Sequence, residues 1–419
     1  MITDKVQRTL EYDKILDKLK LHCGCCVSRE LAEELRPMTE LDEVNSELEL
    51  TAEAESCFLH TGYSPVDDFP DMRSCLKRMN AALFLNCEEL LNIGKCLKAI
   101  RVCRESLASA TKPDDDSIPM GLANIASGLI SHKYLEDEIT RCVLSEDELF
   151  DGASPALARI RRSKRIANER VREKLNSIIR SSTMSKYLQD PIITIRNGRF
   201  VVPVKQEYRQ NIPGLIHDQS GSGQTLFIEP TAVVELGNEF KKLLMEEQAE
   251  VERILTELTA MIKPSANDIY TDILTLGRID LIFAKAKLSK EMKAVRPKLN
   301  AEGRIKIVKG RHPLIPSFRI VPIDVRLGSD FTTLIITGPN TGGKTVTLKT
   351  IGLFALMAQS GMFVPANVGT ELAVFESVFA DIGDEQSIEQ SLSTFSSHMK
   401  NIVGILDSAD DRSLVLIDE

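Results

Sequence analysis

Residues 338–345 read Gly338-Pro-Asn-Thr-Gly-Gly-Lys-Thr345 and match the P-loop pattern in full. The apolar run Leu334-Ile-Ile precedes them, and apolar residues at helical spacing follow from Val346 to Leu353. Glycines at these places let backbone amides approach phosphate oxygens at the start of a helix. We therefore expect a strand over 332–337, then a phosphate-binding turn and a helix, as in an α/β domain.

The side chains of this turn suit ATP and Mg²⁺. Lys344 places a positive charge near the β- and γ-phosphates, and the Thr345 hydroxyl is suited to Mg²⁺. A chance glycine-rich turn, the alternative, explains neither the apolar run before it nor the helical pattern after it. The expected ATP-binding residues are Gly338, Pro339, Asn340, Thr341, Gly342, Gly343, Lys344 and Thr345.

The segment Ser413-Leu-Val-Leu-Ile-Asp-Glu419 places two carboxylates after four apolar residues. It predicts a buried strand that carries both acids at its carboxyl end. We expect Asp418 to hold Mg²⁺ through water. Glu419 and Lys344 are the expected catalytic residues, with Glu419 orienting and deprotonating the attacking water. The pattern is weak alone and gains weight from the P-loop, and an Asp-Glu pair is typical of ABC-type ATPases.

ABC-type sites form between two head domains, so a segment of one head must close over the nucleotide of the other. Ser393 and Thr394, between the two motifs, are suitable hydroxyl donors to a γ-phosphate, and a helix start there would add its dipole. Taken alone, the segment favours a Ser-Thr cap before a surface helix, but its place between a P-loop and an Asp-Glu strand reverses that preference.

The composition favours a helical protein of several domains. The chain has 419 residues, of which 43% are hydrophobic and 5% aromatic, with no Trp and a net charge of −9. No apolar run reaches the length of a membrane span and no signal core begins the chain, so we expect no membrane partner and a cytoplasmic location. The nine cysteines are expected to be reduced and mostly buried, with a structural metal near Cys23 as the alternative.

A basic segment follows the helix start Ser154-Pro155. Between 156 and 180 there are nine Lys or Arg residues and only two Glu residues. Such a segment is either a solvated helix face paired with acids elsewhere or a surface that follows a nucleic-acid backbone. The candidate nucleic-acid contacts are Arg159, Arg161, Arg162, Lys164, Arg165 and Arg172.

Next comes a β-rich insert. Asn197-Gly198 separates two β-prone runs and predicts a tight hairpin, because both residues accept positive φ. Further strands are expected near Gly214 and Thr225, and long helices follow Pro230. Four segments result: a helical core or lever over 1–150, a basic helix and clamp-like insert over 151–235, returning lever helices over 236–296, and an ATPase domain over 297–419.

Residues Gly338 to Thr345, together with Leu392-Ser-Thr-Phe-Ser-Ser-His-Met399, resemble the MutS family. The chain is similar to the bacterial type 2 branch of that family along essentially its whole length, including Arg199-Phe-Val-Val-Pro-Val-Lys205 and Gly310-Arg-His-Pro-Leu314. The resemblance implies a multidomain α + α/β fold. A long helical lever with a small β-rich clamp would precede an ABC-type P-loop ATPase head that is incomplete at its C-terminal end.

The resemblance also implies a homodimer that hydrolyses ATP with Mg²⁺ and closes around nucleic acid. The implied partners are double-stranded or branched DNA, in suppressing recombination, or the rRNA of collided ribosomes. An Smr endonuclease domain is expected in a longer, full-length protein. His312 is expected either near the nucleotide or as a structural histidine.

Two other functions remain as alternatives. One is a nucleotide-switched DNA-binding module without significant ATP turnover, and the Asp418-Glu419 pair argues against it. The other is the ATP-binding subunit of a transporter, which would not need the long helical sequence that precedes the P-loop.

Overall fold

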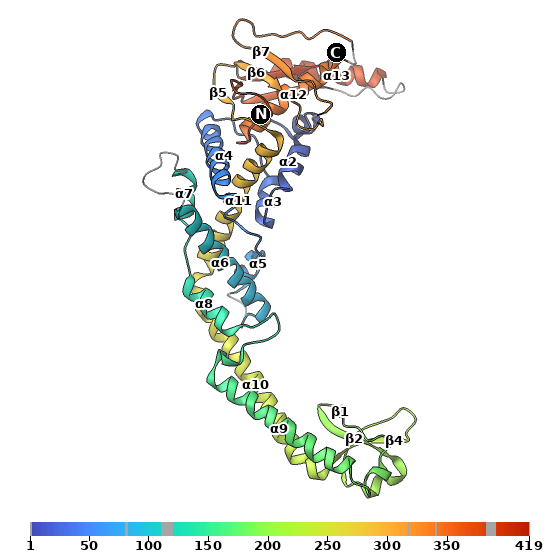
Figure 1. Cartoon of the computed structure of the whole chain (residues 1–419). Coiled ribbons are helices and arrows are strands. Elements are labelled where there is room, and N and C mark those ends of the chain that lie inside the picture. Colours follow the sequence, from blue (N-terminus) through green and yellow to red (C-terminus); the bar gives the residue numbers. More distant parts are fainter. Residues whose placement is uncertain are drawn as a thin grey trace. The chain divides into compact units, whose positions relative to one another are not determined.

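The computed structural model describes residues 2–79, 83–109, 120–316, 318–339, 342–382 and 391–418, and it describes only the backbone of 391–397. The chain is a mixed helical and β protein with two compact units, as expected of a multidomain α + β fold (Figure 1). Unit 1 comprises Met1–Arg73, Lys95–His132 and Asn267–Glu419, and unit 2 comprises Ser74–Gly94 and Lys133–Ala266. The four functional segments expected from the sequence remain predictions.

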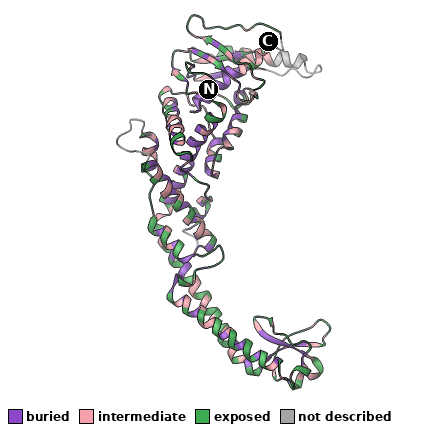
Figure 2. Ribbon diagram, in the orientation of Figure 1, coloured by how far each residue is buried: buried purple, intermediate pink, exposed green. Residues whose placement is uncertain are grey.

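Helices dominate unit 1. Its helices are α1 (Asp4–Thr9), α2 (Tyr12–Lys20), α3 (Cys26–Glu33), α4 (Leu41–Thr61), α7 (Met120–Ser127), α12 (Lys344–Gln359) and α13 (Ser391–Ser408), while α5 (Arg73–Arg78), α6 (Cys87–Ser109) and α11 (Ala266–Met292) span a unit boundary. α11 is buried along most of its length (Figure 2), as is the C-terminal half of α12. The C-terminal half of α12 is apolar on nearly every side, which suits a helix inside a core, whereas α11 also buries the polar residues Asp272, Asp280 and Lys285.

Two sheets complete unit 1. The first has the order β5-β8-β6-β7 and is formed by β5 (Lys298–Asn300), β6 (Ile305–Gly310), β7 (Ile323–Leu327) and β8 (Glu371–Ala373). The second is a parallel pair of β9 (Ser377–Asp381) and β10 (Ser413–Ile417), in which Ile417 lies opposite Asp381.

α12 packs very closely against its neighbours at Gly352. A Cβ added there would lie 2.6 Å from Cδ1 of Leu416 on β10 and 2.8 Å from Cδ1 of Leu10, just after α1. Leu10, Leu416 and Phe354 of α12 belong to one core cluster. The absence of a side chain at Gly352 therefore fixes the spacing between the helix that follows the P-loop and the strand that precedes Asp418.

The expected strand over 332–337 is wrong, because these residues form no strand in the structure. Ile335 is 80% exposed, and the segment lies across a cavity of about 510 Å³ from β10. Apolar residues form a strand only where a neighbouring backbone completes the hydrogen-bond ladder. Here the segment is not hydrogen-bonded to β10.

The expected buried strand is confirmed for one face of β10 only. Leu414 and Leu416 are buried, but Val415 and Ile417 are exposed, Ile417 by 45%. The buried face packs into the core with α12, whereas Val415 and Ile417 line the cavity that separates β10 from residues 332–336. Alternation of this kind is typical of a sheet that is covered on one face.

Unit 2 pairs helices with a small antiparallel sheet. Its elements are α8 (Lys133–Cys142), α9 (Pro155–Ile179), α10 (Thr231–Ile262), β1 (Thr194–Arg196), β2 (Arg199–Lys205), β3 (Gly214–Gln219) and β4 (Thr225–Pro230), with the short 3-10 helices η1 (Asp151–Ala153), η2 (Ser185–Tyr187), η3 (Gln206–Asn211) and η4 (Lys263–Ser265). The sheet order is β1-β2-β4-β3. α9 packs along α10, and Val171 and Val233 from these helices join the apolar core of the sheet.

The predicted hairpin is confirmed. Arg196 of β1 lies opposite Arg199 of β2, and the turn residues Asn197 and Gly198 have φ of 50° and 71°. The two further strands that the sequence predicts are β3 and β4, which pair antiparallel.

The cysteines are mostly buried, as expected. Eight of the nine are buried, and Cys26 is partly exposed. Burial raises the pKa of the Cys23 and Cys25 thiols to about 11, which keeps them protonated at neutral pH. Within the described part of the chain, no group of three or more His, Cys, Asp or Glu residues is arranged to hold a metal ion.

Candidate functional site

The start of α12 forms an open turn of the kind that holds phosphate. Gly343 is the N-cap of α12 with φ of 81°, and it provides no side-chain hydrogen bond to the first amides of the helix. Gly338 has φ of 146°, and a Cβ at either glycine would meet no described atom within 4 Å. The N–H of Gly342 donates to the Pro339 carbonyl at 2.8 Å, which closes the turn. Amides that point from a helix N-terminus into open space suit an anion.

The structure brings the P-loop threonine to the strand-end aspartate. The Thr345 hydroxyl donates to Oδ2 of Asp418 at 2.5 Å, although 73 residues separate them in the sequence. Both side chains are half-buried. A hydroxyl and a carboxylate are oxygen ligands of the kind that Mg²⁺ takes in phosphate-binding sites. The residues present therefore fit Mg²⁺ and a nucleotide phosphate.

A neighbouring aspartate fixes the backbone at Asp418. The N–H of Asp418 donates to the Asp381 carbonyl at 3.0 Å, which extends the β9–β10 ladder by one residue. The Asp381 carboxylate is buried and meets two side chains of α13. Its Oδ2 lies 2.9 Å from Nδ1 of His398, and its Oδ1 accepts from Nδ2 of Asn401 at 2.9 Å.

Asp381, His398 and Asn401 are not among the site residues predicted from the sequence. Two signals were present: Asp381 ends an apolar run, Val378-Phe-Ala-Asp, just as Asp418 does, and His398 and Asn401 are three residues apart in a helical segment.

Several predicted site residues lie outside what the structure describes. Asn340, Thr341 and Glu419 are not described. Ser393 and Thr394 lie in the first turns of α13, where the backbone alone is described. Lys344 is the first residue of α12, directly before Thr345. The roles expected of all these residues remain predictions.

The basic segment forms α9, and two of its cations are turned inward against acids. Nε of Arg161 donates to Glu247 of α10 at 2.9 Å, and Nη1 of Arg161 donates to Asp151 at 2.6 Å. Lys164 also pairs with Glu247. Burial and these two cations act on Glu247 together, and the net effect lowers its pKa. Arg161 and Lys164 thus hold α9 against α10.

Four of the six candidate nucleic-acid contacts face solvent. Arg159, Arg162, Arg165 and Arg172 are exposed. Of these, Arg165 lies 3.8 Å from Asp151, at the limit of an ion pair. Figure 2 colours the exposed residues of α9 green, and they alternate with partly and fully buried ones. Both interpretations of the basic segment therefore apply in part: some of its cations pair with acids, and others are exposed at the surface.

Comparison with known proteins identifies the family. A family model described as MutS domain V matches residues 334–419. The Endonuclease MutS2 of Alkaliphilus oremlandii is 51% identical over 418 residues, which cover 100% of this chain and 52% of that protein. Those of Acetivibrio thermocellus and Clostridioides difficile are 51% and 47% identical, again over 100% of this chain and 52% of each protein. The chain belongs to the MutS family, in its MutS2 branch.

This membership confirms the resemblance that the sequence motifs indicated. The chain spans about half the length of the curated relatives it matches. In the described part of the chain, no helix combines the length and the apolar character that crossing a bilayer requires.

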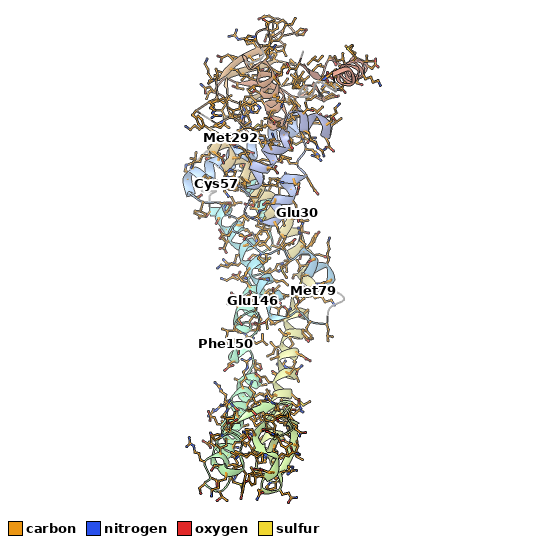
Figure 3. All side chains as sticks on the ribbon, turned by 90° about the vertical axis from the view of Figure 1, so that its right-hand side faces the viewer. Glu30, Cys57, Met79, Glu146, Phe150 and Met292 are labelled. Atoms are coloured by element: carbon orange, nitrogen blue, oxygen red, sulfur yellow. The ribbon has the colours of Figure 1, made fainter. Side chains whose placement is uncertain are left out.

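His312 is buried and held by the backbone. Its Nδ1 accepts from the N–H of Leu314 at 3.3 Å, and burial lowers its pKa. It lines a cavity of about 930 Å³ together with Arg311 and Met292. Met292 ends α11 and is labelled in Figure 3. None of the described P-loop residues lines this cavity. The contacts of His312 are those of a structural histidine.

Proposed function

We propose that this chain is the nucleotide-binding and lever portion of a MutS2-type ATPase that closes on nucleic acid. The observation that carries the proposal is the 2.5 Å hydrogen bond from Thr345 to Asp418, because it joins the P-loop to the acid at the end of β10. The open glycine turn before α12 supports it further. Residues 297–419 would then form an ABC-type P-loop ATPase head.

Each residue of the proposed site has a distinct task. The backbone of 338–345 binds the phosphates, and Lys344 orients the β- and γ-phosphates through its charge. Thr345 and Asp418 would hold Mg²⁺, which neutralises phosphate charge when bound. Glu419 would accept the proton of the attacking water. Ser393 and Thr394 would complete the site of a partner subunit, which requires a homodimer.

The proposed client is nucleic acid, either double-stranded or branched DNA or the rRNA of a ribosome. The exposed Arg159, Arg162, Arg165 and Arg172 support it, since a row of solvated cations binds phosphates without regard to sequence. The relatives carry the name endonuclease, and we propose nuclease activity for the full-length protein. A cytoplasmic location belongs to the same proposal.

The first experiment tests turnover. Phosphate release is measured for the full-length protein and for its Glu419→Gln and Thr345→Ala variants. We expect the wild type to release phosphate, Glu419→Gln to bind ATP without turnover, and Thr345→Ala to lose Mg²⁺-dependent binding. A wild type that binds ATP but releases phosphate no faster than Glu419→Gln would refute the ATPase and favour a nucleotide-switched DNA-binding module.

The second experiment identifies the client. Full-length Glu419→Gln protein is purified from lysate with ATP, and the nucleic acid that accompanies it is sequenced. Ribosomal RNA in intact particles would indicate a ribosome-directed function in quality control. Branched or repetitive DNA would indicate control of recombination.

The third experiment tests the basic surface of α9. A triple variant, Arg162→Gln, Arg165→Gln and Arg172→Gln, should flatten the salt dependence of binding by about 0.7–0.9 in log–log slope for each phosphate that is no longer neutralised. The matched control changes Lys241, Lys242 and Lys263 to glutamine, three exposed cations of α10 and η4 with the same total charge. Equal slopes in the two triple variants would indicate that α9 is a solvated helix face and does not bind nucleic acid.

A further inference from the structure

A hydrogen-bonded chain runs from α1 to the strand end beside Asp418. At its outer end, Nζ of Lys5 in α1 donates to Oδ1 of Asn401 at 3.1 Å. Asn401 lies on α13, and its Nδ2 donates inward to Oδ1 of Asp381 at 2.9 Å. Asp381 ends β9, and its carbonyl accepts from the N–H of Asp418. Three segments far apart in the sequence thus meet through one amide side chain.

Asn401 suits this place because its two ends differ. An amide oxygen can only accept and an amide nitrogen can only donate, so a cation on one side and a carboxylate on the other fix its orientation. Lys5 supplies the cation and Asp381 the carboxylate. Hydrogen bonds to charged groups are the stronger ones, and bonds in a chain polarise one another.

Asp381 is the buried anchor of this chain. It is 6% exposed, and both of its carboxylate oxygens face α13, one toward Asn401 and one toward His398. Its main chain supports Asp418. A displacement of α13 therefore acts on the residue that holds the backbone of Asp418.

α1 is fixed to the same region by packing. Val6 and Leu10 belong to the core cluster that also contains Ala380 of β9 and Leu416 of β10. Lys5 is exposed, so it reaches Asn401 along the edge of this core.

We propose that Lys5, Asn401 and Asp381 form a relay of positioning residues. It couples the first helix of the chain to the position of α13 and, through Asp381, to Asp418. This inference rests on the proposed function, because α13 carries the predicted signature residues Ser393 and Thr394. In this relay, a movement of Lys5 with α1 changes the position of Asn401, and Asn401 passes the change to Asp381 through its hydrogen bond.

The test is a double-mutant cycle in the full-length protein, read as kcat and KM for ATP. Asn401→Leu keeps the size of the side chain and removes both bonds. We expect its kcat to fall about tenfold, the usual weight of a charge-assisted bond, with KM within about twofold. Lys5→Met should lower kcat about threefold, and the double variant should match Asn401→Leu alone, because links in series do not add. The matched control is Arg8→Met, another exposed cation of α1.

The outcomes separate the relay from simple stabilisation. Unchanged kcat in Asn401→Leu, or a double variant about thirtyfold slower because the single effects multiply, would overturn the relay. An effect of Arg8→Met equal to that of Lys5→Met would do the same. Because Lys5 is exposed, its variant tests the relay even if Asn401→Leu does not fold.

A second readout does not need turnover. Hydrogen exchange of the α13 amides should slow when ATP binds to the wild type, and this protection should be lost in Lys5→Met. A wild type without phosphate release would refute the proposed ATPase while the exchange measurement still tests the relay. Protection by ATP that is identical in wild type and Lys5→Met would overturn it.

Discussion

Replacing Glu47 with glutamine removes the charged partner of a buried lysine. Lys285 of α11 is 2% exposed, and its Nζ lies 3.1 Å from Oε2 of Glu47 on α4. Glu47 itself is 22% exposed and also pairs with Arg278 at 3.1 Å. Burial lowers the pKa of Lys285 and the Glu47 charge opposes that shift. The pair is therefore asymmetric: the lysine depends on the glutamate, while the glutamate has a second partner.

The asymmetry sets the expected magnitudes. Leaving one partner of a buried pair uncompensated costs about 3–5 kcal/mol of stability. Because Glu47 is partly exposed, we expect Glu47→Gln to destabilise the fold by about 3 kcal/mol. Lys285→Met fills the same space without a charge, and Glu47 keeps Arg278. We expect that variant to change stability by about 1 kcal/mol or less.

The pH dependence has a definite sign. The folded pKa of Lys285 lies below its usual 10.5, so the unfolded chain binds more protons between the two values and stability rises with pH in that interval. Without the Glu47 carboxylate the folded pKa falls further. The deficit of Glu47→Gln at neutral pH should therefore shrink as pH approaches 10.5.

The assay is native-state hydrogen exchange over α4 and α11, which reports on unit 1 separately from unit 2. It compares Glu47→Gln, Lys285→Met and wild type near pH 7 and near pH 9. Equal losses in both variants, or a deficit in Glu47→Gln that is independent of pH, would refute this account of the pair.

Three further predictions concern single residues. Gly352→Ala should cost about 1–3 kcal/mol in thermal unfolding, because its Cβ would overlap Leu416. Burial raises the pKa of Asp272 from 3.8 to about 6, so the folded wild type loses stability as pH rises through that interval. Asp272→Asn should remove this loss and be more stable than the wild type by about 1–3 kcal/mol at neutral pH, as measured by urea unfolding. Gly343→Ala forces a side chain into φ of 81° and should weaken ATP binding about tenfold in titration calorimetry, with Gly404→Ala, on the open surface of α13, as control.

Predictions that depended on neighbouring residues were confirmed by the structure. Asn197-Gly198 forms the turn between β1 and β2 because both residues accept positive φ. Ser154 caps α9, its hydroxyl accepting from the Leu157 N–H at 3.0 Å, and Pro155 is the first helical residue. In both cases the physical cause lies within a few residues.

Predictions that depended on distant partners were wrong or incomplete. The segment 332–337 has strand-forming residues and no ladder partner, and β10 lacks cover on one face. The count of basic residues on α9 did not distinguish Arg161 from Arg162, because Glu247 lies on another helix. The same holds for Asp381, whose role depends on how α13 packs against β9. No local motif encodes such pairings.

Because the buried cysteines react only after the surrounding structure opens, their alkylation rates report how often each unit opens. Cys75, Cys87 and Cys142 lie in unit 2, and the other buried thiols lie in unit 1, where burial raises the pKa of Cys103 to about 12. An alkylating reagent attacks thiolate, so the folded chain should react first at the partly exposed Cys26. The time at which each buried cysteine is alkylated then reports the opening of the unit that contains it. Mass spectrometry of the adducts can therefore compare the opening rates of the two units in one sample, although the chain has no tryptophan to report on unfolding.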